Sequence, residues 1–110
     1  MPLKTIPSTA RERKRYLLVK VESDSSIERK DLENAILNAC LQFLGELGVG
    51  KAGILVMGDT WNGKTIIVKT SNKMVDETKS AISLIKSIAD RKVRLSITKV
   101  SGSISKLKGE

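Results

Sequence analysis

Hydrophobic and polar residues alternate in two stretches near the ends of the chain, and this pattern predicts β-strands. The stretches cover residues 15–22 and 93–98, and each places three apolar side chains on one face: Leu17, Val19 and Val21, then Val93, Leu95 and Ile97. Residues 52–57 are apolar and residues 65–70 are rich in β-branched side chains, with Asn62-Gly63 between them, as is typical of a hairpin. The pattern therefore predicts four strands.

Two other stretches carry apolar residues at helical intervals. The first predicts a helix over about 26–47, with Ser25 and Glu28 at capping-box spacing and Gly48 as its left-handed stop; its apolar positions are Leu32, Ile36, Ala39, Cys40, Phe43 and Leu47. The second predicts a helix from Ser71 or Asn72 to near Ala89, with an apolar stripe made of Val75, Ala81, Ile82, Ile85 and Ile88.

The element order βαββαβ predicts an α+β, ferredoxin-like sandwich over residues 15–101. We expect a four-stranded antiparallel sheet of order 4-1-3-2 with two helices on one face. Residues 1–14 are expected to form a flexible basic arm and residues 102–110 a basic tail. In this fold the first strand begins, and the last strand ends, at the same end of the sheet.

Positive charge is concentrated at the two ends of the chain. The 110 residues carry 20 Lys and Arg against 12 Asp and Glu, a formal charge of +8. Residues 1–20 and 91–110 each hold six basic and one acidic residue, whereas residues 21–90 are slightly acidic. Because the fold brings both ends together, we predict one RNA-binding edge, although basic termini that serve only solubility are the other interpretation. Its predicted residues are Arg11, Arg13, Lys14, Arg15, Arg94, Lys99, Lys106 and Lys108.

The sheet face away from the helices is predicted to be open. Tyr16, Leu18 and Ile67 would be exposed there, and an apolar central face is better explained by a protein partner than by water. Aromatic residues are too few for base stacking across the sheet, so we expect recognition of RNA mainly through phosphates. Trp61 lies in the predicted hairpin loop, either as an anchor of the loop or as a contact residue.

The composition offers no candidate catalytic or metal-binding residues. Histidine is absent and Cys40 is the one cysteine, which removes zinc sites, Ser-His pairs and internal disulfides and favours a reducing, cytoplasmic location. We expect no bound cofactor, no signal peptide and no membrane span. Residues 58–65 match the phosphate-loop pattern G-x-x-x-x-G-K-[ST], but a strand is predicted after Lys64 where such loops open into a helix, so a phosphate site at Gly63-Lys64 is kept only as an alternative.

Four segments resemble a known family of small ferredoxin-like proteins. They are Lys14-Arg15-Tyr16-Leu17, Leu44-Gly45-Glu46-Leu47-Gly48, Ala81-Ile82-x-Leu84-Ile85 and Val100-Ser101-Gly102-Ser103-Ile104. In order and spacing they are similar to protein component 2 of archaeal ribonuclease P, a family shared with eukaryotic ribonucleases P and MRP. The resemblance spans roughly residues 14–106; Ser103 stands where threonine is more usual, and the loop around Trp61 has no clear counterpart.

The resemblance implies a non-catalytic subunit of a ribozyme that removes the 5′ leader from precursor tRNA. It also implies that ribonuclease P RNA carries the Mg²⁺ and the chemistry, and that a TIM-barrel-like protein subunit is a direct partner. A homodimer is compatible with the sequence as well. A stand-alone RNA-binding or ribosome-associated protein is the alternative within RNA biology.

Overall fold

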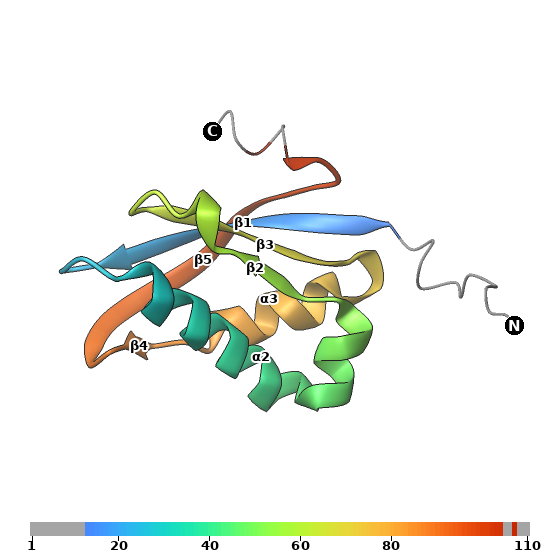
Figure 1. Cartoon of the computed structure of the whole chain (residues 1–110), viewed down its shortest axis with the longest axis horizontal. Helices are drawn as coiled ribbons and strands as arrows, with labels where there is room; N and C mark the ends of the chain where they lie inside the picture. Colours follow the sequence, from blue (N-terminus) through green and yellow to red (C-terminus); the bar gives the residue numbers. More distant parts are fainter. Residues whose placement is uncertain (1–12, 105–106, 108–110) are drawn as a thin grey trace, which may run out of the picture.

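Five antiparallel strands form one curled sheet (Figure 1). The computed structural model describes residues 13–104 and residue 107. The strand order is β2-β3-β1-β5-β4. The strands are β1 (Lys14–Ser23), β2 (Leu55–Met57), β3 (Thr65–Ser71), β4 (Ser87–Ile88) and β5 (Arg91–Ser101).

The four predicted strands have the neighbours expected of them, but the predicted total of four is wrong. β5 pairs with β1 from Tyr16↔Ser101 to Ser23↔Val93, so the start of β1 and the end of β5 lie together. The additional strand, β4, pairs with the first residues of β5. Ala89 and Asp90 join them with φ of 52° and 67°, the left-handed pair that a tight two-residue hairpin requires.

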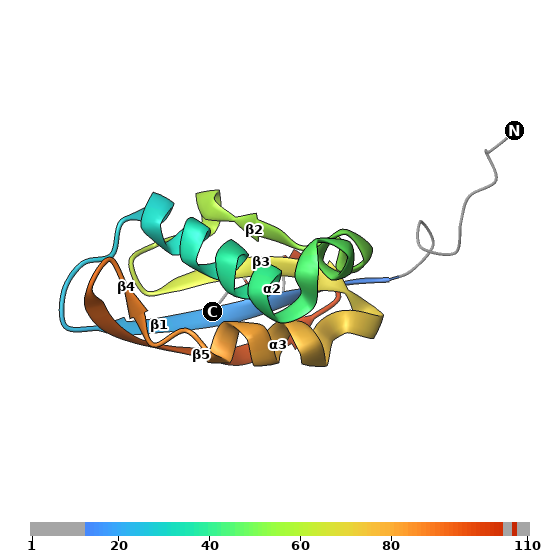
Figure 2. The same ribbon diagram turned by 90° about the horizontal axis from the view of Figure 1, so that it is seen from below.

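Two α-helices cover one face of the sheet, as predicted (Figure 2). They are α2 (Arg29–Ala52) and α3 (Val75–Ser83), and short 3₁₀ turns, η1 (Gly58–Thr60) and η2 (Asn72–Met74), flank β3. The helices bury their apolar stripes against the odd-numbered positions of β1. The fully buried residues of this core include Leu17, Val19, Leu32, Ile36, Cys40, Ile66, Val68 and Ile82.

The predicted helix ends need correction. α2 does not stop at Gly48 but continues, with a break at Gly45 (φ 77°), to a left-handed cap at Gly53 (φ 62°) whose N–H donates to the carbonyl of Val49. Its N-cap is Glu28, with no side-chain hydrogen bond, so Ser25 forms no capping box. α3 ends at Ser83 rather than near Ala89, which leaves Ser87 and Ile88 free to pair with β5.

The sheet face away from the helices is covered by the chain's own C-terminal residues, which contradicts the expected open face. Leu18 and Ile67 are only 8% and 2% exposed. They form a second apolar cluster with Leu107, itself 2% exposed, and Tyr16, Met57 and Ile104 pack around it. Two residues of the predicted basic tail, Ile104 and Leu107, therefore pack on this face of the sheet, and we call these two residues the C-terminal strap.

Candidate nucleic-acid interface

Three predicted cationic residues line one hollow at the end of the sheet where β1 begins and β5 ends. Arg13 directly precedes β1, Arg15 lies on β1, and Lys99 lies on β5. The other lining residues are Val100, Ser101 and Gly102. We call this set the basic hollow. Among the residues that the structure describes, no carboxylate lines it, so the lining favours an approaching anion.

A β-bulge sets the position of Lys99. The β1–β5 register shifts between Leu18 and Val19: Ile97 pairs with Val19 and Lys99 with Leu18, which leaves Thr98 without a pairing partner. The Thr98 hydroxyl donates to the carbonyl oxygen of Leu18 over 3.3 Å. Bulges re-aim the side chains that follow them, and here Lys99 is opposite Leu18 instead of Leu17.

The guanidinium of Arg15 is held beside the chain reversal after β5. Its Nη1 donates to the carbonyl oxygen of Lys14 over 3.2 Å. A Cβ atom at Gly102 would lie 3.1 Å from the same Nη1, so the glycine leaves the room that the guanidinium occupies. Arg13 is exposed at the rim. Two guanidinium groups and an ammonium around one hollow match the geometry of phosphate recognition, because guanidinium groups can bind phosphate oxygens in pairs.

Two other predicted RNA-binding residues lie outside the basic hollow. The Lys14 side chain reaches Gly53 at the end of α2, where a Cβ would lie 3.2 Å from its Nζ. Arg94 is the cross-strand neighbour of Glu22, near the opposite end of β1. It lines a depression there together with Glu22, Asp24 and Lys92. Its predicted place beside Arg13 and Arg15 is therefore wrong. The cause is the length of β5: Lys99 follows Arg94 by five positions, which is about 17 Å along a strand. Arg11, Lys106 and Lys108 lie outside the described residues.

The predicted protein-interface residues do not form an exposed surface. Leu18 and Ile67 are buried beneath Leu107, and Tyr16 is partly buried at the side of the same cluster. Leu18 and Ile67 therefore cannot contact a partner unless the strap leaves. The basic tail contributes two apolar residues to this cluster, Ile104 and Leu107, which are too few to give a sequence pattern.

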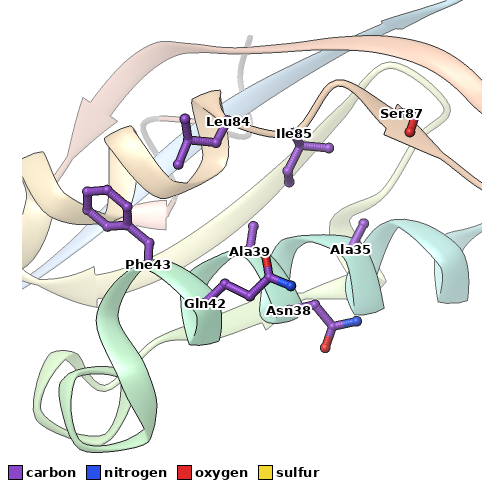
Figure 3. Close-up of a pocket in the computed structure, with 8 residues that line it drawn as sticks. All are labelled: Ala35, Asn38, Ala39, Gln42, Phe43, Leu84, Ile85 and Ser87. Atoms are coloured by element: carbon purple, nitrogen blue, oxygen red, sulfur yellow. The ribbon is translucent and has the colours of Figure 1, made fainter.

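A different apolar surface lies between the two helices, and the sequence analysis missed it (Figure 3). Figure 3 shows Phe43 on α2 and Leu84 just after α3 flanking a cavity of about 330 Å³. Phe43 is 48% and Leu84 59% exposed, although Phe43 was expected in the core. The described residues that line the cavity carry no charge; besides Phe43 and Leu84 they are Ala35, Asn38, Ala39, Gln42, Ile85 and Ser87.

The phosphate-loop interpretation of residues 58–65 fails on its context, as expected. β3 begins at Thr65, directly after Lys64, so no helix N-terminus follows the glycine. Instead, Oδ1 of Asn62 accepts hydrogen bonds from the N–H groups of Lys64 (2.9 Å) and Thr65 (2.8 Å), which closes a turn. Trp61 anchors this loop, since its Nε1 donates to the carbonyl oxygen of Ile27 over 3.3 Å.

The next groups to consider as reactive or metal-binding are the buried thiol of Cys40 and the carboxylates. Burial raises the pKa of the Cys40 thiol to about 11, so at neutral pH the thiol is protonated and unreactive. Within residues 13–104 and 107, no three Asp, Glu or Cys side chains come close enough to hold a metal ion. In the same part of the chain no helix has the length and apolarity to cross a membrane.

Comparison with known proteins identifies the family. The model of the Rpp14/Pop5 family matches residues 15–110. The chain belongs to this family. The matched region contains the sheet except for its first residue, Lys14, together with both helices and Leu107 of the C-terminal strap.

Several relatives in the family carry the name ribonuclease P protein component 2. The protein of Pyrococcus furiosus is 34% identical over 105 residues, which are 96% of this chain and 88% of the relative. That of Methanocaldococcus jannaschii is 35% identical over 96% of this chain and 78% of its own length. That of Methanobrevibacter smithii is 32% identical over 94% of this chain and 92% of its own length. The resemblance noted in the sequence is thereby confirmed.

The fold also recurs in a solved structure. A chain in the cryo-EM structure of yeast ribonuclease MRP superposes with a TM-score of 0.67, covering 84% of this chain and 76% of its own. Their sequences are 17% identical, so the likeness concerns the fold alone.

Proposed function

We propose that the chain is a non-catalytic RNA-binding subunit of ribonuclease P, which supports the catalytic domain of the ribonuclease P RNA while the 5′ leader is removed from precursor tRNA. The observation that carries this proposal is the basic hollow, where the cationic side chains of Arg13, Arg15 and Lys99 line one opening. Membership of the Rpp14/Pop5 family supports the choice of RNA.

The basic hollow would act by neutralising phosphates where two RNA segments approach each other. Each cation that contacts a phosphate releases condensed counterions and weakens the repulsion between strands. The RNA itself would hold the Mg²⁺ for the chemistry, and the protein would supply no cofactor. Lys14, together with Arg11, Lys106 and Lys108 of the terminal segments, would extend the contact to further phosphates.

A TIM-barrel-like ribonuclease P subunit is the proposed protein partner, and the cavity between α2 and α3 is its proposed docking site. The uncharged lining suits a protein surface and not RNA, and the exposed side chains of Phe43 and Leu84 would supply the apolar anchors. Phe43→Glu or Leu84→Glu should prevent the two proteins from co-eluting in gel filtration, while Glu46→Gln, on the exposed surface of α2, should not. Co-elution of both Glu variants would refute this site. A shift of the isolated chain from dimer to monomer in Phe43→Glu would instead assign the cavity to a homodimer.

Purification of the native complex tests the proposed function. The tagged chain, expressed in its own organism and recovered from the cytoplasmic fraction, should bring down ribonuclease P RNA and an activity that removes the 5′ leader of precursor tRNA. Recovery of ribosomal subunits, or of the chain alone, would reject ribonuclease P in favour of a ribosome-associated or stand-alone RNA-binding protein. Because the RNA would do the chemistry, the purified chain alone should not cleave precursor tRNA.

A further inference from the structure

We propose that a second site, at the other end of β1, binds one nucleotide of single-stranded RNA with its base against Trp61. The site is a cavity of about 510 Å³ between the turn after β1 and the loop before β3. Trp61, Lys64 and Lys20 line it together with Glu22, Ser23 and Ser25. Arg13 and Arg15 of the basic hollow lie at the start of β1, whereas Lys20 and Glu22 of the cavity lie near its end, so the two sites are separated along this strand.

The Trp61 side chain is held in place before any ligand arrives. Its Nε1 donates to the carbonyl oxygen of Ile27, and its backbone N–H donates to the carbonyl oxygen of Gly58 over 3.0 Å. The ring is partly exposed and borders the cavity. An aromatic ring that is already ordered loses little conformational entropy when a base stacks on it, and stacking on aromatic side chains is a common way to bind single-stranded RNA.

The polar groups of the cavity are suited to the remaining parts of a nucleotide. Lys64 is fixed through its backbone, because its carbonyl oxygen accepts from the N–H of Val21 over 2.8 Å and its own N–H donates to Asn62. Lys20 also lines the cavity, and its Nζ lies 3.6 Å from Oε2 of Glu22. The two ammonium groups can bind a phosphate, and the serine hydroxyls can bind ribose oxygens.

Glu22 favours a nucleotide over a bare anion. Its carboxylate lines the same cavity as the two lysines, so it repels free phosphate while accepting hydrogen bonds from donors on a base edge. The exocyclic amino groups of cytosine and guanine are such donors. The basic hollow differs in this respect: its described lining includes neither a carboxylate nor an aromatic ring, and it suits backbone phosphates of any sequence.

Fluorescence gives a direct test, because Trp61 is the one tryptophan of the chain. The full-length protein is titrated with a five-nucleotide oligocytidylate, with an abasic strand of the same length and with inorganic phosphate. We expect saturable quenching by the oligocytidylate, with at least roughly fivefold weaker binding of the abasic strand, as stacking contributes about 5- to 150-fold in affinity. Equal affinity of the two strands, saturation by inorganic phosphate alone, or no saturable quenching would each overturn the proposal.

Variants separate this site from the basic hollow. Lys64→Gln should weaken binding of the oligocytidylate several-fold. Lys51 is an exposed lysine at the end of α2, and the Lys51→Gln variant should bind the oligocytidylate as the parent protein does. The inference rests on the proposal that the chain binds RNA, but two sets of variants distinguish a failure of the nucleotide site from a failure of the proposed function. The double variant Arg13→Gln/Arg15→Gln should weaken the binding of ribonuclease P RNA but leave the quenching by the oligocytidylate intact. Loss of quenching in Lys64→Gln, with binding of ribonuclease P RNA retained, would identify the nucleotide site.

Discussion

Replacement of Leu107 by alanine tests whether the C-terminal strap is part of the fold. Leu107 is 2% exposed and covers Leu18 and Ile67 on the sheet. Burial of a leucine side chain contributes about 1.5–3 kcal/mol, and Leu→Ala changes in protein cores cost about 2–5 kcal/mol. Tyr16, Met57 and Ile104 pack around the same cluster and can fill part of the space left behind, so we expect a loss near the lower limit, about 2 kcal/mol in the free energy of unfolding.

The assay is thermal unfolding followed by circular dichroism, with urea unfolding for the free energy. In a domain of this size 1 kcal/mol corresponds to about 4–8 °C, so the Leu107→Ala midpoint should fall by about 8–16 °C. Leu47→Ala is the matched control, because Leu47 is 76% exposed on α2 and its loss should change stability by less than about 0.5 kcal/mol. If Leu107→Ala melted with the parent protein, the strap would not pack on the sheet and the predicted open face would be restored.

Three further substitutions or measurements test the packing described above. Thr78→Val removes the partner of the buried Thr70 hydroxyl, 3.0 Å away, and should cost about 1–3 kcal/mol in urea unfolding; an unchanged midpoint would show that the pair contributes nothing. Gly53→Ala, at φ 62°, should destabilise by about 1 kcal/mol, whereas Gly50→Ala inside α2 should be neutral or stabilising, and equal effects would contradict the left-handed cap. Cys40, with its pKa raised to about 11, is only about 0.1% thiolate at pH 8 and should react with a thiol reagent only after denaturation; labelling of the native protein as fast as of the denatured protein would refute its burial.

The order of the four predicted strands was predictable because the element order βαββαβ, with right-handed crossovers, places the last of them beside the first. The same reasoning placed the start of β1 beside the end of β5, which the pairing of Tyr16 with Ser101 confirms. It could not locate the helix end, because any of the four glycines from Gly45 to Gly53 can stop a helix, and the left-handed cap lies at the last of them.

The candidate site was predictable only in part. Charge counting by segment grouped Arg94 with Lys99, although strand geometry separates them along β5 and places Arg94 beside Glu22. The bulge at Thr98, which sets the partner of Lys99, has no mark in the sequence. The nucleotide cavity also escaped notice, since Lys20, Glu22 and Trp61 come together only when the hairpin loop folds over the end of β1.

The salt dependence of binding to ribonuclease P RNA tests the central claim, that the basic hollow contacts RNA phosphates. The double variant Arg13→Gln/Arg15→Gln is compared with Lys92→Gln/Arg94→Gln, which removes the same charge from the far end of β5. We predict that the slope of log K against log salt decreases in magnitude by about 1.4–1.8 for the first pair, at about 0.7–0.9 for each lost phosphate contact, and stays at the parent value for the second. Equal slopes in the two double variants would contradict the account.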